Sequence, residues 1–227
     1  MMDRSREPIV TIDGPAGAGK STVARLLATR LGYRLLDTGG MYRALAWSVA
    51  RAGIDPDDAV AIARHLARVT VTIDGDRFFV NGRDVSAEIR TPEIGALTSR
   101  ITAFAPVRDK VTPLQRRLAS EGGVVLEGRD TGTVVCPDAE VKFFLDASIE
   151  TRARRRQTEL AAAGRTLPLE AVRDEIRVRD AQDRTRALAP LRKAEDAIPV
   201  DTSARTTDEV VGFMLEVVER HRCCTRS

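Results

Sequence analysis

A glycine-rich stretch near the amino terminus places the strongest constraint on how this chain can fold. The apolar run at residues 9–12 is followed by DGPAGAGKST, which matches the spacing G-x-x-x-x-G-K-[ST] at Gly14, Gly19, Lys20 and Ser21. Such a loop joins a strand to a helix and wraps phosphate oxygens with its backbone N–H groups. The helix-forming run STVARLLATRLG comes next. The motif therefore predicts a strand, loop and helix that bind a nucleoside triphosphate, but it does not name the reaction.

The residues of this loop are expected to bind the phosphates of ATP. Lys20 would reach the β- and γ-phosphates, and Ser21 would supply a hydroxyl ligand to Mg²⁺. An acidic partner for the hydrated ion usually stands at the end of another core strand, where VVLEGRD offers Glu127. A salt bridge between Glu127 and Arg129 that only caps the strand is the structural alternative. The expected ATP-binding residues are Gly14, Pro15, Ala16, Gly17, Ala18, Gly19, Lys20, Ser21 and Thr22, with Ser21 and Glu127 at the metal.

Short apolar runs alternate with helix-forming stretches along the rest of the chain. This alternation is typical of an α/β fold in which helices cover a mostly parallel sheet. The length of 227 residues suits one such unit, and two full domains are not expected. The expected strands are 9–12, 33–36, 124–126, 141–145 and 198–200, and the expected helices are 20–30, 41–52, 56–67, 107–120, 149–162, 169–187 and 207–221.

Residues 69–85 interrupt the alternation. The sequence VTVTIDGDRFFVNGRDV contains short extended segments separated by Gly-Asp and Asn-Gly turns, and Asn-Gly is a strong hairpin signal. We predict a small antiparallel insert between the second and third core strands. It is either a surface hairpin or part of a substrate-binding module. The second interpretation is favoured because ligands of open α/β sheets lie beyond the carboxyl ends of the strands.

The basic residues are concentrated in one part of the chain. The net charge is only +3, but residues 151–194 contain eleven arginines and one lysine against six acidic residues. Arg179, Asp183 and Arg186 recur at i, i+4 and i+7, on one face of a helix. A solvated, salt-bridged face usually explains such a pattern. The preceding helix has a second group of arginines at Arg152, Arg155 and Arg156. Two converging arginine faces repel each other unless an anion offsets their charge.

The second expected strand ends in LLDTGGMYR, where a further anion-binding group is possible. Thr38 can be a simple helix cap and Tyr42 a core aromatic residue. In the functional alternative, Tyr42 and Arg43 face a second anion beside the first. One loop for a nucleoside triphosphate and separate arginines for another anion describe a phosphoryl transferase. A phosphate acceptor is already ionised near neutral pH and needs no general base, so the chain's two histidines are no obstacle.

Composition argues against several other classes of protein. The hydrophobic content of 43% and charged content of 30% are those of a soluble globular protein. No apolar stretch approaches the roughly 20 residues that span a bilayer, and the start MMDRSREP lacks a signal-peptide core, so a cytoplasmic protein is expected. Cys136, Cys223 and Cys224 show no metal-ligand spacing, and we expect reduced thiols without a catalytic role.

Six segments of the chain stand out together: TIDGPAGAGKST, LLDTGGMYR, DVSAEIRT, EGRDTGTVVCPDA, KFFLDAS and RDAQDRTRALAPL. In order and spacing they closely resemble the bacterial cytidylate kinases, a family of P-loop nucleoside monophosphate kinases. The resemblance extends from about Ile9 to about Val218. Its most specific marks are GRD-x-GTVV and RD-x-x-D-R-x-R-x-x-(A)-PL, which other nucleoside monophosphate kinases do not share.

The resemblance implies transfer of a phosphoryl group from ATP, with Mg²⁺, to CMP or dCMP. It implies a single P-loop kinase unit over residues 1–227, with a five-stranded parallel sheet flanked by helices. The implied parts are a core of residues 1–37, 107–150 and 168–227, an acceptor-binding region with the antiparallel insert at 38–106, and a small mobile helical lid at 151–167. It also implies a monomer that binds neither nucleic acid nor membranes.

The family's site residues can be carried over position by position. Ser99, Arg108 and Asp130 would meet the cytosine, and Arg179 and Asp183 would hold the sugar, with Thr38 near it. The acceptor phosphate would meet Tyr42, Arg43, Arg129 and Arg186. Arg152 and Arg156 would close over the ATP phosphates. The residues expected to carry catalysis are Lys20, Arg129, Arg152, Arg156 and Arg186.

Three positions depart from the family pattern. Glu127 replaces an aspartate, Thr38 replaces a serine and Ser21 replaces a glycine. Two other functions also fit parts of the sequence. One is a P-loop kinase for another acceptor, such as UMP or a small metabolite alcohol; the other is a GTP-dependent switch or a nucleic-acid-binding ATPase. The chain has no Asn-Lys-x-Asp motif to read guanine, and its basic segment lacks interleaved aromatic residues for stacking on bases.

Overall fold

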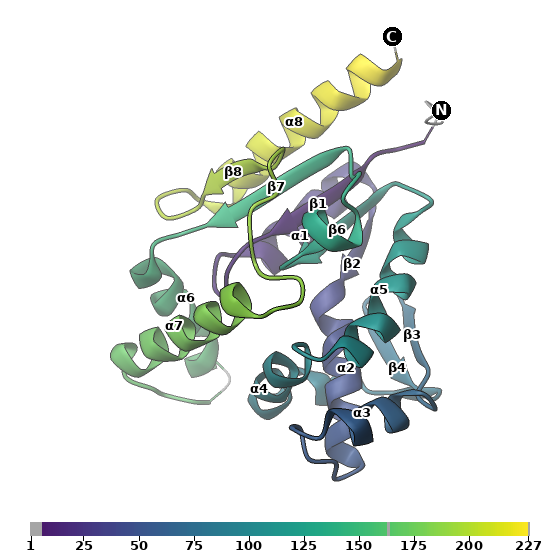
Figure 1. The fold of residues 1–227 in the computed structure, drawn as a ribbon. Coiled ribbons are helices and arrows are strands. Elements are labelled where there is room, and N and C mark those ends of the chain that lie inside the picture. The colour runs from purple at the N-terminus through teal and green to yellow at the C-terminus, as the bar shows by residue number, and fades with distance from the viewer. Residues whose placement is uncertain (1–5, 163, 227) are drawn as a thin grey trace. The chain divides into compact units, whose positions relative to one another are not determined.

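A computed structural model describes residues 6–162 and 164–226 and contains the five-stranded parallel sheet expected from the sequence (Figure 1). The strand order is β2-β6-β1-β7-β8. The bounds are β1 Ile9–Asp13, β2 Arg34–Asp37, β6 Val124–Gly128, β7 Val141–Asp146 and β8 Ile198–Asp201. All five predicted strands are confirmed within one to two residues at each end.

The central strand β1 brings the glycine-rich loop to one edge of this sheet. All five of its residues are buried, and it pairs in parallel with both β6 and β7. β-Branched residues buried on both faces are typical of a strand inside a parallel sheet. Asp13 lies in register with Gly128 of β6 and with Phe144 of β7. The loop therefore begins where the carboxyl ends of these strands meet.

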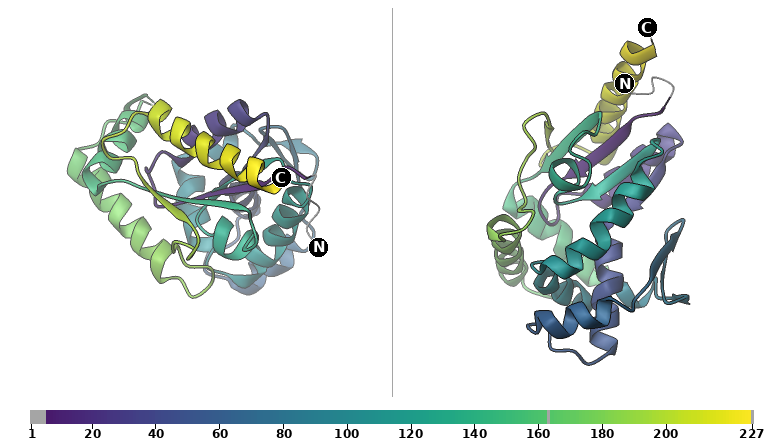
Figure 2. Two further views of the ribbon diagram at one scale, coloured as in Figure 1. Left: turned by 90° about the horizontal axis from the view of Figure 1, so that it is seen from above. Right: turned by 45° about the vertical axis from the view of Figure 1, so that its right-hand side comes forward.

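Two helices pack side by side on one face of the sheet, namely α1 (Lys20–Leu31) and α8 (Thr207–Arg226) (Figure 2). Helix α1 starts inside the glycine-rich loop and ends at Gly32, whose φ of 69° lets its N–H bond the carbonyls of Ala28 and Thr29. Within the described residues, none of the helices has the combination of length and apolar character that crossing a membrane requires.

Two further helices, α6 (Ile149–Ala162) and α7 (Leu169–Thr185), pack against each other. The contact has an apolar core of its own, to which each helix contributes two fully buried residues: Ala153, Leu160, Val172 and Ile176. These helices match the expected ranges 149–162 and 169–187 closely. The basic segment of the sequence is therefore a helical hairpin with an apolar seam and charged outer faces.

The chain divides into two compact units. One comprises the residues up to Arg34 and those from Gly122 onward; the other comprises residues 35–121. The second unit contains α2 (Thr38–Arg51), α3 (Ala59–Leu66), α4 (Pro92–Ile101), α5 (Ala105–Ala119), a short 3-10 turn at Glu88–Arg90, and a three-stranded antiparallel sheet of β3 (Val71–Asp74), β4 (Arg77–Val80) and β5 (Arg83–Asp84). The predicted insert is confirmed, and its Asn-Gly turn has positive φ at both residues, 49° at Asn81 and 81° at Gly82.

A close contact joins this small sheet to α2. A Cβ atom added to Gly40 would lie 2.3 Å from the Phe78 ring, and Phe78 is fully buried. Glycine is required at position 40 because the ring of β4 fills the space beside the helix backbone.

Three local features differ from the sequence expectations. Helix α2 begins at Thr38 rather than 41, because the Asp37 carboxylate caps it by accepting from the Gly40 N–H at 2.7 Å. Helix α4 was not predicted. A π-helical turn at Thr131–Val135 was also not predicted, and it follows β6 directly at the carboxyl edge of the sheet.

Candidate active site

The glycine-rich loop has the backbone shape of a phosphate cradle. Gly14, Gly17 and Gly19 have φ values of 150°, 74° and 88°, a range that residues with side chains rarely adopt. A Cβ atom at Gly14 would lie 1.9 Å from the carbonyl oxygen of Leu145, so the loop must pass the end of β7 without a side chain. The loop geometry is therefore fixed by the backbone.

Lys20 is buried inside this loop. Its ammonium donates to the Pro15 carbonyl at 2.7 Å, and only 6% of the residue is exposed. Burial lowers the pKa of Lys20 to about 7, and the nearby Arg129 guanidinium adds to this lowering while Glu127 opposes it. A buried ammonium surrounded by other cations is costly alone, and it is stabilised when phosphate oxygens arrive.

Ser21 and Glu127 form a pair of hard oxygen ligands beside Lys20. The Ser21 hydroxyl donates to Glu127 Oε2 at 2.9 Å, and the carboxylate belongs to a residue that is 8% exposed at the end of β6. Hydroxyl and carboxylate oxygens suit Mg²⁺, which keeps several waters and is usually bound by one or two protein ligands together with substrate phosphates. These two residues therefore fit the metal expected from the sequence.

Two arginines and two aspartates meet near the carboxyl end of β6, and we call them the arginine–aspartate cluster: Arg129, Asp130, Asp183 and Arg186. Arg129 Nε donates to Asp183 Oδ2 at 2.9 Å. The Arg186 guanidinium lies 3.6 Å from both Asp130 and Asp183, and its side chain is only 9% exposed. Residues that follow β6 are thus joined to residues at the end of α7.

The charges of this cluster offset one another. Burial opposes ionisation of Asp183, but the guanidinium groups of Arg129 and Arg186, with the hydrogen bond from Arg129, hold its pKa below the ordinary value. Arg179, one turn before Asp183, also contributes to this lowering and to that of the Lys20 pKa. The cluster, Arg179 and Lys20 therefore share one electrostatic environment.

The arginines of α6 are held in three different ways. Arg152 is buried, and its NH1 group donates to Asp180 Oδ2 at 2.6 Å and to the Ala16 carbonyl at 3.0 Å. Arg155 donates to the hydroxyl and the carbonyl of Thr202 at 2.9 and 2.7 Å. Arg156 forms an exposed pair with Glu159. Carboxylates and carbonyls thus offset the repulsion that the sequence suggested, so this repulsion alone does not require a bound anion.

Four of the five expected residues of the second unit form two small groups. The Arg108 guanidinium stacks 5.5 Å from the centre of the Tyr42 ring, and it also donates to the Thr102 carbonyl at 3.4 Å. Arg43 NH1 donates to the Ile89 carbonyl at 3.3 Å, and the same guanidinium lies against Gly95. The Ser99 hydroxyl donates to the Gly95 carbonyl at 3.4 Å. Thr38 is buried at the first residue of α2.

A hollow of about 360 Å³ opens beside the glycine-rich loop. Gly17, Gly19 and Thr22 line one part of it. The other lining residues include Arg155, which the sequence analysis placed in the second arginine group, and Thr202 and Arg205, which the sequence interpretation did not select. Thr202 and Arg205 follow β8 at the carboxyl edge of the sheet, and this position was the signal that could have identified them.

Comparison with known proteins identifies the family. The cytidylate kinase family model matches residues 10–220. The chain belongs to the cytidylate kinase family. A cytidylate kinase of Geobacter sp. (strain M21) is 52% identical over 220 residues, covering 95% of this chain and 94% of the relative. One from Mycobacterium avium (strain 104) is 50% identical over 221 residues, covering 95% and 97%.

A solved structure supports the fold alone. An uncharacterized protein from Eubacterium ventriosum ATCC 27560 aligns with a TM-score of 0.52 at 12% identity, covering 94% of this chain and 99% of that one.

Two of the three departures from the cytidylate kinase pattern contact each other in this structure, because the Ser21 hydroxyl donates to the Glu127 carboxylate. The longer acid and the added hydroxyl therefore form one altered pair in this family member.

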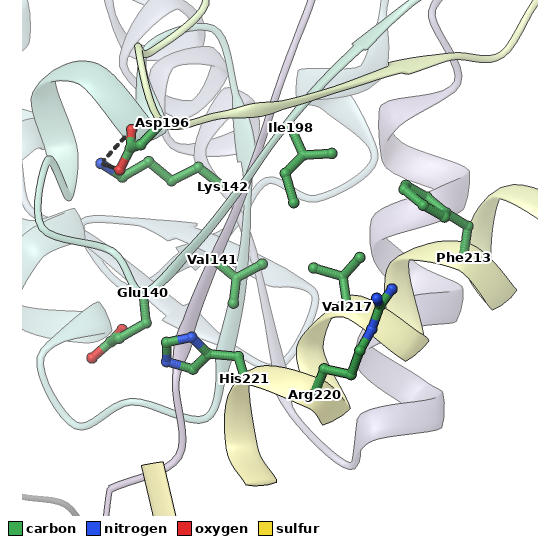
Figure 3. Close-up of a pocket in the computed structure, with 9 residues that line it drawn as sticks. All are labelled: Glu140, Val141, Lys142, Asp196, Ile198, Phe213, Val217, Arg220 and His221. Atoms are coloured by element: carbon green, nitrogen blue, oxygen red, sulfur yellow. Dashed lines mark hydrogen bonds and ion pairs between the residues drawn. The ribbon is translucent and has the colours of Figure 1, made fainter. Parts of the chain in front are cut away.

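A second hollow lies away from the glycine-rich loop (Figure 3). It is lined by the start of β7 and by α8, including Val141, Lys142, Phe213 and Val217, and Lys142 is paired with Asp196 there at 2.8 Å. Val141 is the first residue of β7, so this hollow is at the amino edge of the parallel sheet. Ligands of open α/β sheets bind at the opposite edge.

Proposed function

We propose that this protein transfers the γ-phosphoryl group of ATP to CMP or dCMP, giving ADP and CDP or dCDP. One observation supports this proposal most strongly. Lys20 of the glycine-rich loop shares its electrostatic environment with Arg129, Arg179 and Asp183. Arg129, to which we assign the acceptor phosphate, therefore lies close enough to interact electrostatically with the lysine that we assign to the terminal phosphates of ATP, as transfer between two phosphates requires.

On the donor side, the loop residues 14–22 bind the ATP phosphates, and the hollow beside the loop receives the base. Ser21 and Glu127 would hold the Mg²⁺ ion, which would supply positive charge to neutralise the charge that develops on the phosphates. Lys20 stabilises the transferring group. The support is the positive φ of three loop glycines, the 2.9 Å pair of Ser21 and Glu127, and the lining of the hollow.

On the acceptor side, we assign roles from the family pattern. The phosphate of CMP is held by Tyr42, Arg43, Arg129 and Arg186; the sugar by Arg179 and Asp183, with Thr38 near it; and the cytosine by Ser99, Arg108 and Asp130. Within one unit the contact of Arg108 with Tyr42, and within the other the arginine–aspartate cluster, bring together residues that we assign to the same acceptor nucleotide. Asp130 is an acceptor for the exocyclic amine of cytosine, which uracil lacks.

The chemistry needs positioning and charge stabilisation more than proton transfer. The acceptor phosphate is ionised near neutral pH, so an oxygen of CMP attacks without a base. Arg129 and Arg186 exchange part of their bonding to Asp183 and Asp130 for the phosphate oxygens. Residues 38–106 form the acceptor-binding region, and residues 151–167 form a lid in which Arg152 and Arg156 approach the ATP phosphates and water is excluded. The protein acts as a monomer.

A coupled assay of ADP formation tests the proposal directly. Mg·ATP is supplied with CMP, dCMP, UMP, AMP, GMP or shikimate in turn, with controls that lack acceptor or Mg²⁺. Turnover largely confined to CMP and dCMP is expected. Turnover of another acceptor would contradict the cytosine assignment, and loss of ATP without acceptor would indicate an ATPase.

A further inference from the structure

A buried carboxylate at the end of β1 has no role in the mechanism described so far. Asp13 is 4% exposed and immediately precedes Gly14 of the glycine-rich loop. Its Oδ1 atom accepts from the Thr131 backbone N–H at 2.9 Å and from the Thr131 hydroxyl at 2.8 Å. Its Oδ2 atom accepts from the Gly132 N–H at 2.8 Å. All three donors belong to the π-helical turn after β6.

This turn has a tight fit against β1. A Cβ atom at Gly132 would lie 2.9 Å from Thr11 Oγ1 and 3.4 Å from Asp13 Oδ2, so glycine allows the turn to approach the strand. Backbone hydrogen bonds also close this turn. The N–H groups of Val134 and Val135 donate to the Asp130 carbonyl, and the N–H group of Cys136 donates to the Thr131 carbonyl. The position of Asp130 is therefore set by a segment that bonds to Asp13.

We infer that Asp13 is a positioning residue that fixes the acceptor side of the site to the first residue of the donor loop. Its bonds to Thr131 and Gly132 orient the two residues before them, Asp130 and Arg129. Asp130 pairs with Arg186, and Arg129 pairs with Asp183. The carboxylate itself touches neither nucleotide. This inference rests on the proposed function, because Asp130 is assigned there to cytosine and Arg129 to the acceptor phosphate.

A carboxylate is better suited to this task than an amide. Its two oxygens accept all three bonds, whereas an asparagine offers one acceptor and turns an NH₂ group toward a donor. Burial raises the pKa of Asp13 overall and the nearby Asp130 adds to the rise, while the hydrogen bonds from Gly132 and Thr131 oppose it. A purely structural carboxylate at a strand end would support folding without affecting how CMP binds. The two roles can therefore be separated by kinetics.

The test compares four variants of the full chain. Asp13→Asn removes the second acceptor oxygen, and Thr131→Val removes one of the three bonds with little change of shape. Thr131→Ser keeps that hydroxyl. Thr133→Val is the matched control in the same turn, because the Thr133 hydroxyl is buried and has no hydrogen-bond partner among the described residues. The measurements are KM for CMP and for ATP, the ratio of kcat/KM for CMP over UMP, and the melting temperature.

We expect Asp13→Asn to lower kcat/KM for CMP about 10²-fold and Thr131→Val about tenfold, with KM for ATP within about threefold of wild type. The preference for CMP over UMP falls in both variants. Thr131→Ser and Thr133→Val stay within about twofold of wild type. If Asp13→Asn does not fold, the comparison of Thr131→Val with Thr131→Ser carries the test.

Two outcomes would overturn the inference. Equal KM for CMP and equal CMP preference in Thr131→Val and Thr131→Ser, with wild-type protein active on CMP, would leave Asp13 a structural residue and the proposed function intact. Wild-type protein that does not phosphorylate CMP would overturn the proposed function, and the inference with it.

Discussion

The glycine-rich loop and the arginine–aspartate cluster, both proposed to bind phosphate, are built by different physical means. The loop is a run of nine consecutive residues whose shape depends on backbone conformation, as at Gly14 and Gly19. The cluster depends on side-chain pairs between residues 54 positions apart, such as Arg129 and Asp183. A site made by backbone is encoded locally, whereas a site made by paired side chains depends on the packing of the whole unit. The two regions should therefore fail in different ways when altered.

Replacing the loop lysine should separate activity from stability. Lys20→Met removes the cation proposed to stabilise the transferring phosphoryl group, and we expect kcat to fall about 10²–10³-fold. The same change removes a buried charge, and we expect the free energy of unfolding at pH 7 to rise. Urea unfolding measures the change in stability, and the coupled assay measures the change in kcat. A variant less stable than wild type at pH 7 would contradict the expectation that burial of the Lys20 charge destabilises the folded chain.

The stability gain of Lys20→Met should depend on pH with a defined sign. The pKa of Lys20 is about 7 in the folded chain, against an ordinary value of 10.5. Between these values the unfolded chain binds the extra proton, so the stability of wild type rises with pH relative to the variant. The advantage of the variant is therefore greatest below pH 7 and disappears by pH 10.5. Unfolding curves at pH 6.5, 8 and 9.5 check this slope.

A backbone change should harm the loop without any loss of charge. In Gly14→Ala the new methyl group would lie 1.9 Å from the Leu145 carbonyl oxygen, so the loop must move away from β7. We expect kcat/KM for ATP to fall about 10²-fold. Gly32→Ala is the matched control: its φ is also positive, but a Cβ atom there meets nothing within 4 Å. Equal activity of the two variants would show that the close approach does not matter.

The cluster should respond to side-chain geometry at constant charge. Arg186→Lys keeps the positive charge but loses the planar fork that reaches both Asp130 and Asp183. We expect KM for CMP to rise about tenfold, with KM for ATP within about twofold of wild type. Steady-state kinetics with each substrate varied in turn provide the measurement. A larger effect on ATP than on CMP would place Arg186 on the donor side.

Replacing Arg156 of α6 should have the smallest effect on stability among these variants. Arg156 pairs with Glu159 on the helix surface, where such pairs contribute little. We expect Arg156→Ala to change the free energy of unfolding by less than about 0.5 kcal/mol. The proposed role in the closed lid predicts that KM for ATP rises in the same variant. Unchanged kinetics would remove Arg156 from the proposed site.

The sequence contained enough local information for most of the fold. The five strands, the Asn-Gly turn at Asn81 and Gly82, and the loop before α1 all depend on short patterns, and the structure confirms them. Helix α4 had a local signal that was missed, because Thr91 caps it and Pro92 stands at its first turn. Two glycines after Thr38 concealed the true start of α2, which the Asp37 cap determines.

The remaining features depend on contacts between residues far apart in the sequence, which no local pattern reveals. The π-helical turn is held by Asp13, 118 residues earlier in the chain, so its own sequence TGTVV does not predict it. The helical spacing of Arg179, Asp183 and Arg186 indicated a shared face, but the pairing of Asp183 with Arg129 was not predicted. Arg152 was expected to contact the ATP phosphates. The sequence of its helix contains no signal for its buried ion pair with Asp180 on the next helix. Its part in catalysis stays a prediction.

The contact between Gly40 and Phe78 limits the order in which this sequence can change over generations. An alanine at position 40 would place its methyl group 2.3 Å from the ring while Phe78 is present. A smaller residue at position 78 would first leave a cavity, which in a buried core costs about 3–5 kcal/mol when phenylalanine becomes alanine. A lineage can thus reach the double change only through the second route, at a loss of stability. A descendant with a side chain at position 40 should therefore also have a smaller residue at position 78.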